Sequence, residues 1–250
     1  MRMHTYGGLD VRIAGGPDRE GGGNGPVVIL LHGFGAPGDD LVALWRMLRV
    51  PDAVRFVFPV APLKLDDGPY DGRAWWMLDM DRIARQTAEG RGRDIEEVPD
   101  GLAAARERVL AMLDDLDRHE GLPPDRIFLG GFSQGAMLAC ETVLRSARQF
   151  AGLIILSGSI IAKLEWEERW PARKGLPVFQ SHGTDDPLLP HETAIQLKDS
   201  LIRHGLPVTW HEFRGGHEIP LPVLEQLGQF LMTTTLDPRM RKDDSKKRPG

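Results

Sequence analysis

The chain has 250 residues, of which 41% are hydrophobic and 27% charged, the composition of an ordinary globular protein. Its formal net charge of −5 argues against a general attraction to nucleic acid or to anionic membrane surfaces. It contains no run of about 18 apolar residues, and its N-terminus lacks the apolar stretch of a secretory signal, so we expect a cytoplasmic protein without a stable membrane anchor. A single cysteine, Cys140, excludes an intrachain disulfide and any metal site built from several cysteines.

Short apolar runs alternate with helical patterns along the chain. Residues 3–14 predict a leading hairpin that turns at Gly7 and Gly8. The runs typical of strands are 27–33, 54–59, 126–132, 152–158, 177–183 and 207–213. Helical periodicity covers 39–49, 100–119, 135–147, 190–204 and 221–234. This alternation predicts an α/β fold with a mostly parallel central sheet and helices on both faces, formed by residues 1–235 as a single domain.

Three segments fit neither pattern. The long connection 60–98 has the length of a functional loop. Its aromatic and apolar side chains would either wall a substrate pocket or simply anchor the loop: Trp75, Trp76, Leu78 and Met80. The segment 159–173, which includes Ile160, would either rim the same pocket or cover the core. Residues 236–250 are polar and basic, and we expect them to be a disordered, solvated tail.

Residues 131–135, GFSQG, match the pattern G-x-S-x-G around Ser133. An apolar strand precedes the match and a helical pattern follows it, which is the setting of the nucleophile elbow in the α/β-hydrolase fold. The turn is so tight that the positions two before and two after the serine must be small. The serine hydroxyl would then project at a helix N-terminus, whose dipole favours developing negative charge. Ser133 is therefore the predicted nucleophile.

A serine hydroxyl needs a base to take its proton, and this fold supplies acid and base in the chain order Ser, Asp, His. His217 follows the last predicted strand, after two glycines that allow its loop to turn back toward Ser133. Two adjacent aspartates, Asp185 and Asp186, follow the preceding strand. The proline at 187 biases Asp186 toward an extended backbone, so the two carboxylates point apart, but this spacing alone leaves the choice between them open.

The chain resembles the phospholipase/carboxylesterase family, which includes bacterial carboxylesterases and acyl-protein thioesterases. The matching segments are LHGFG at 31–35, AP at 61–62, GFSQG at 131–135, HGTDDPLLP at 182–190 and GHEI at 216–219. The resemblance spans about residues 26–235. It implies that Asp186 is the acid of the triad. It also implies that the backbone N–H groups of Phe34 and Gln134 form an oxyanion hole.

The chain departs from the family pattern in two places. Ala36 and Pro37 stand where an aspartate commonly follows the His-Gly-Leu-Gly segment, a change that should alter loop packing more than chemistry. The aromatic-acidic segment before the long helix reads WWMLD at 75–79. This second departure leaves the substrate preference of the chain open.

The predicted function is hydrolysis of short to medium acyl esters through an acyl-enzyme, with a small-molecule ester as the partner. No zinc motif, dinucleotide fingerprint or P-loop is present, so no metal or other cofactor is expected. The same triad would also serve an acyl-thioesterase or a lysophospholipase. A binding protein that retains the fold without turnover is the alternative outside enzymes, and the presence of all three triad residue types argues against it. The sequence does not specify an oligomeric state.

Overall fold

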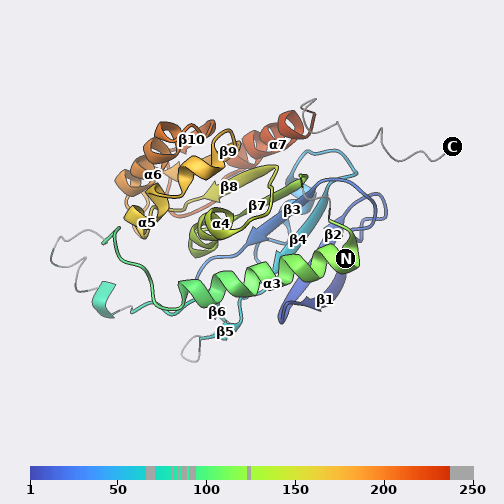
Figure 1. The fold of residues 1–250 in the computed structure, drawn as a ribbon, viewed down its shortest axis with the longest axis horizontal. Helices are drawn as coiled ribbons and strands as arrows, with labels where there is room; N and C mark the ends of the chain where they lie inside the picture. The colour runs from blue at the N-terminus through green and yellow to red at the C-terminus, as the bar shows by residue number, and fades with distance from the viewer. Residues whose placement is uncertain are drawn as a thin grey trace.

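The computed structural model describes residues 1–65, 71–79, 81–83, 85, 89, 94–122 and 125–236. An eight-stranded sheet has the order β1-β2-β4-β3-β7-β8-β9-β10 (Figure 1). The first two strands, β1 (Arg2–Tyr6) and β2 (Leu9–Gly15), form the predicted antiparallel hairpin, and β2 also runs antiparallel to β4. The other six pair in parallel: β3 (Val27–Leu31), β4 (Arg55–Pro59), β7 (Ile127–Phe132), β8 (Gly152–Leu156), β9 (Val178–Gly183) and β10 (Val208–Phe213). The α/β-hydrolase fold predicted above is confirmed.

Helices cover both faces of the sheet because successive strand residues point to opposite sides. Ile29 and Leu31 pack on the face covered by α3 (Leu102–Glu120), α4 (Gln134–Arg145), α5 (Lys163–Glu167), the 3-10 turn η1 (Trp170–Arg173) and α6 (His191–Arg203). Val28 and Leu30 pack on the opposite face, against α1 (Leu44–Met47) and α7 (Leu221–Leu236). Figure 1 shows the long helix α3 and the shorter α4 on one side of the sheet.

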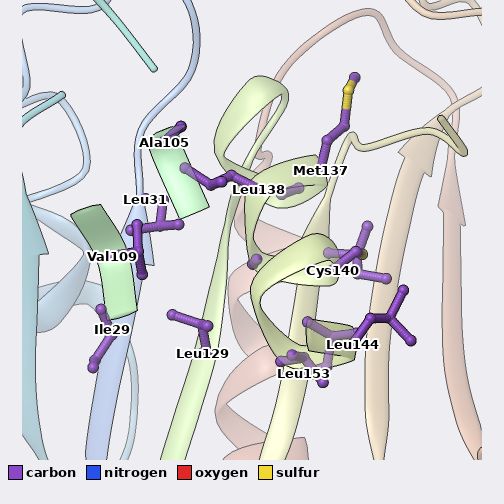
Figure 2. Close-up of a cluster of buried hydrophobic side chains, with 14 of the residues drawn as sticks. Ile29, Leu31, Ala105, Val109, Leu129, Met137, Leu138, Cys140, Leu144 and Leu153 are labelled. Atoms are coloured by element: carbon purple, nitrogen blue, oxygen red, sulfur yellow. The ribbon is translucent and has the colours of Figure 1, made fainter. Parts of the chain in front are cut away.

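The core between α3, α4 and the sheet is continuous and apolar (Figure 2). Figure 2 shows Val109 of α3 beside Ile29 and Leu31 of β3, and Leu138 of α4 pointing toward Ala105 of α3. Cys140 is fully buried in this layer, and burial raises the pKa of its thiol. The cysteine is therefore a packed apolar side chain rather than a reactive one.

Two sequence predictions differ from the structure in detail. The helix expected over 39–49 is a single turn, α1, preceded by turns with i to i+3 hydrogen bonds such as Leu44 N–H to Leu41 O. The connection 60–98 contains an unpredicted pair of short antiparallel strands, β5 (Leu63–Lys64) and β6 (Arg73–Ala74). Helix α7 includes the first residue of the expected tail, and 237–250 lie outside the described residues, as does Met80. None of the helices in the described ranges has the length and apolar character needed to cross a membrane.

Candidate active site

Ser133 lies at the sharp turn between β7 and α4, with φ 55° and ψ −119°. A positive φ at a residue other than glycine is strained, and such strain is found at functional sites. The flanking glycines allow the turn to form. A Cβ at Gly131 would lie 2.4 Å from the carbonyl oxygen of Leu31, and a Cβ at Gly135 would lie 2.1 Å from the same oxygen. The G-x-S-x-G pattern thus has a steric origin in the close approach of β3 to the turn.

Asp186 and His217 meet beside this turn. The Nδ1 of His217 lies 2.7 Å from Oδ2 of Asp186, whose side chain is inaccessible to solvent. The other carboxylate oxygen, Oδ1, accepts the backbone N–H groups of Leu188 at 2.8 Å and Leu189 at 2.9 Å. Burial alone would raise the pKa of Asp186. The hydrogen bonds from His217 and these two N–H groups outweigh it and lower the pKa, so the carboxylate is held ionised.

The loops that carry this acid and this histidine are tied together through their backbones. The N–H of Asp185 donates to Gly215 O, and the N–H of Thr184 donates to Phe213 O, both at 2.9 Å. A Cβ at Gly183 would lie 2.3 Å from Gly216 O, so only glycine permits this approach. The pairing of β9 with β10 therefore places the two loops side by side, joined by backbone hydrogen bonds.

His182 lies next to the carboxylate of Asp186, a position that was not predicted from the sequence. It is fully buried, and its Nε2 lies 2.9 Å from Leu189 O and 3.4 Å from Oδ2 of Asp186. Burial lowers the pKa of His182, so the ring is neutral, with the proton on Nε2 donated to the Leu189 carbonyl. His182 is the last residue but one of β9, within the run 177–183 that predicted a strand.

Ser133 and His217 line a common cavity of about 200 Å³. Its other described lining residues are mostly apolar: Gly33, Phe34, Ala36, Asp40, Leu78, Ile83, Phe132, Leu188 and Leu189. The ring of Phe132 packs against that of His217 with centroids 4.7 Å apart. Leu78 lines the cavity, one of the two alternatives that the sequence left open for its loop. Four other lining residues were not predicted, because they come from three separate segments without a shared sequence signal. They are Asp40, Ile83, Leu188 and Leu189.

Trp75 and Trp76 are not among the described residues that line this cavity. Both are buried in the core, with exposures of 2% and 1%. The side chain of Gln134 binds their backbone: its Oε1 accepts the N–H of Trp75 at 3.0 Å, and its Nε2 donates to the carbonyl oxygen of Trp76 at 2.8 Å. The indole N–H of Trp75 donates to His32 O at 2.9 Å. The aromatic pair therefore anchors the loop, which is the second of the two interpretations given above.

Ile160 is also in the core rather than on the cavity wall, with 1% exposure. The segment that follows is fixed by Trp166, whose indole N–H donates to the buried carboxylate of Glu141 on α4 at 2.8 Å. Arg106 of α3 binds the same carboxylate at 2.7 Å. This segment covers the core because its large side chains complete the layer beside α4.

The loop after β3 lies directly beside the turn that carries Ser133. A Cβ at Gly33 would lie 3.3 Å from Cβ of Ser133, and the next residue, Phe34, lines the cavity. Gln134 is the first residue of α4, where backbone N–H groups have no partner within the helix and the dipole is positive. Both positions suit donors to an anion that forms next to Ser133.

The chain is similar to known proteins over most of its length. Residues 21–235 match the model of the phospholipase/carboxylesterase family. The chain is 30% identical over 214 residues to acyl-protein thioesterase 1 of Neurospora crassa, covering 82% of this chain and 84% of the relative. Acyl-protein thioesterase 1 of Kluyveromyces lactis is 30% identical over 220 residues, covering 82% of this chain and 90% of the relative.

Solved structures give the same result. The crystal structure of esterase PE8 superposes with a TM-score of 0.74 at 32% identity and covers 89% of this chain and 97% of its own. The Bacillus cereus carboxylesterase shares the fold, with a TM-score of 0.67 at 20% identity, covering 90% of this chain and 94% of its own. The chain therefore belongs to the phospholipase/carboxylesterase family and is a carboxylic-ester hydrolase of the serine esterase type.

Proposed function

We propose that Ser133, His217 and Asp186 form the catalytic triad of an acyl-enzyme mechanism. The observation that carries the proposal is the 2.7 Å contact between His217 Nδ1 and Asp186 at the wall of the cavity that Ser133 lines. With Nδ1 engaged by the acid, Nε2 of His217 is the nitrogen left to take the proton of Ser133 as its oxygen attacks the ester carbonyl. The ionised Asp186 orients the ring and stabilises the imidazolium that forms.

The oxyanion is proposed to bind the N–H groups of Phe34 and Gln134. These donors come from the two segments that meet at Ser133, and loss of one such donor typically costs about 3–4 kcal/mol of transition-state stabilisation. The imidazolium of His217 then protonates the leaving alcohol, which departs and leaves Ser133 acylated. Water attacks the acyl-enzyme with His217 again as the base, which releases the acid and restores the serine.

Short to medium acyl esters are the proposed substrates. The wall is apolar, so each buried acyl methylene should contribute about 0.8 kcal/mol until the cavity is filled. The cavity is small, about 200 Å³ within the described residues, so this gain should end after a few carbons. Thioesters are the second candidate, because two relatives at 30% identity are named acyl-protein thioesterases and the same acyl-enzyme would form from either substrate.

The test is kcat/KM for a p-nitrophenyl ester series from acetate to palmitate, together with a butyrate oxygen ester and its matched thioester. Rates should rise over the first few carbons and then fall. Ser133→Ala should lose at least about ten-thousandfold in turnover on every substrate. Ser146→Ala, at the other end of α4, is the matched control and should match the wild type. Hydrolysis by Ser133→Ala at the wild-type rate would refute the mechanism, and a maximum at palmitate would refute the substrate class.

A further inference from the structure

Asp40 brings a carboxylate to the otherwise largely apolar wall of the active-site cavity. It follows β3 on the loop that carries Phe34, and it lines the same cavity as Ser133 and His217. Apart from His217, it is the only titratable side chain among the described lining residues. The negative charge of the Asp40 carboxylate would attract or repel any charged group of a substrate that fills the cavity.

Nothing in the described part of the chain neutralises Asp40 by an ion pair with lysine or arginine. Arg12 on β2 instead binds Gly38 O at 3.1 Å and lies 3.7 Å from the carboxylate of Asp39. Asp40 is an exposed residue that also lines the cavity. Burial raises the pKa of the Asp40 carboxyl.

His32 does not supply a compensating positive charge. Its Nε2 accepts the N–H of Ala61 at 2.9 Å, so the ring proton is on Nδ1, which lies 2.8 Å from Gly33 O. Burial also lowers the pKa of His32, which keeps the imidazole neutral. The field of the Asp40 carboxylate therefore reaches the cavity without cancellation by a buried cation.

We propose that Asp40 is a specificity-determining residue that selects the charge of the ester: it favours substrates with a cationic group and disfavours those with an anionic one. This inference rests on the proposed function, since it requires substrate to occupy the cavity beside Ser133. A carboxylate a few ångströms from a substrate charge, in a partly water-filled site, should change the relative rate about tenfold in each direction. Because the site is open to solvent, added salt should weaken the effect.

Two sets of esters matched in shape test the proposal at about pH 8, where the carboxyl is ionised. The first set carries the charge on the alcohol: butyrates of choline, of its carbon isostere and of isethionate. The second carries it on the acyl group: methyl esters of γ-butyrobetaine, of its carbon isostere and of glutaric acid. The quantity measured is kcat/KM of each charged ester divided by that of the neutral isostere in its set.

In at least one set, the wild type should favour the cation and disfavour the anion by about tenfold each. Asp40→Asn should bring both ratios close to one, and Asp40→Glu, which keeps the charge, should preserve their order. Asp39→Asn is the matched control, because it removes the same charge from the neighbouring residue, which is exposed like Asp40 but is not among the described residues that line the cavity. It should leave the ratios unchanged.

Ratios close to one in the wild type, or ratios that Asp40→Asn leaves unchanged, would overturn the inference. So would an equal effect of Asp39→Asn, since the selection would then come from net charge rather than from the cavity. Salt dependence gives a test that needs no variant. Raising the ionic strength should bring both kcat/KM ratios of the wild type closer to one. Failure of the wild type to hydrolyse any neutral ester would instead count against the proposed function, so the two failures are distinguishable.

Discussion

Two adjacent aspartates differ completely in their surroundings. Asp185 is exposed, and its backbone N–H ties the loop to Gly215. Asp186 has no accessible side-chain surface and accepts hydrogen bonds from His217 and two backbone N–H groups. Since the residues are neighbours of the same type, their substitution by asparagine separates the role of the buried acid from any general effect of removing a negative charge from this loop.

Asp186→Asn should lose about ten-thousandfold in kcat, while Asp185→Asn should stay near the wild type. An amide at 186 permits the wrong tautomer of His217 and removes the charge that stabilises the imidazolium. Steady-state hydrolysis of p-nitrophenyl butyrate measures the effect, with thermal unfolding as the check that both variants fold. An inactive Asp185→Asn beside an active Asp186→Asn would show that the acid has been assigned to the wrong residue.

The pKa of Asp186 also predicts how stability depends on pH. A carboxyl with a lowered pKa in the folded state contributes stability that is present above its unfolded pKa of about 3.9 and is lost as the pH falls through the folded value. The difference in Tm between the wild type and Asp186→Asn should therefore shrink as the pH is lowered from about 5 toward about 2. Thermal unfolding of the pair at several pH values tests this. A difference that stays constant with pH would mean that the native fold does not favour the ionised carboxyl.

At the scale of elements, the side chain of Gln134 joins the turn at Ser133 to the loop that carries Trp75, Trp76 and Leu78. Its amide accepts the backbone N–H of Trp75 and donates to the carbonyl oxygen of Trp76. Leu78, two residues after Trp76, lines the cavity. Gln134 also offers its own N–H beside Ser133. Gln134 is thus a positioning residue that couples the substrate wall to the start of α4.

Gln134→Met should destabilise the protein by about 2–4 kcal/mol, because two buried backbone groups lose their partners while the apolar volume is kept. The backbone N–H at 134 remains, so we expect KM for p-nitrophenyl butyrate to rise more than kcat falls. Urea unfolding and steady-state kinetics measure the two effects. Gln149→Met, at an exposed position, is the control and should change neither. Unaltered KM and stability in Gln134→Met would show that the clamp does not position the wall.

The sequence was sufficient to predict features that depend on local determinants. The elbow is encoded in five residues between an apolar strand and a helix, and the parallel sheet in runs of apolar residues. The cavity wall was harder to predict because it depends on contacts between distant segments. Trp75 and Trp76 are buried because Gln134 and His32 bind them from other elements. Likewise, the spacing along the chain did not decide whether Asp185 or Asp186 is the acid. In the folded chain, the backbone N–H groups of Leu188 and Leu189 bind Asp186 and so distinguish the two.

For the whole molecule, strand order decides which residues meet. β3, β7, β9 and β10 run in the same direction, so the loops that follow them share one edge of the sheet. Phe34, Ser133, Asp186 and His217 are far apart in sequence, and each comes from one of these loops or from the elbow turn. Helix α4 begins at the site with Gln134, and Ile83, which lies in a helical stretch of the connection 60–98, lines the cavity.

The most direct test of the central claim is covalent labelling of the wild-type protein with a fluorophosphonate, read by intact mass and by peptide mapping. We expect one phosphonyl group per chain, attached to Ser133, and a loss of ester hydrolysis in proportion to labelling. Ser133→Ala should take up no label. An active preparation that stays unlabelled, or a label that maps to another residue while activity is lost, would contradict the assignment of Ser133 as the nucleophile.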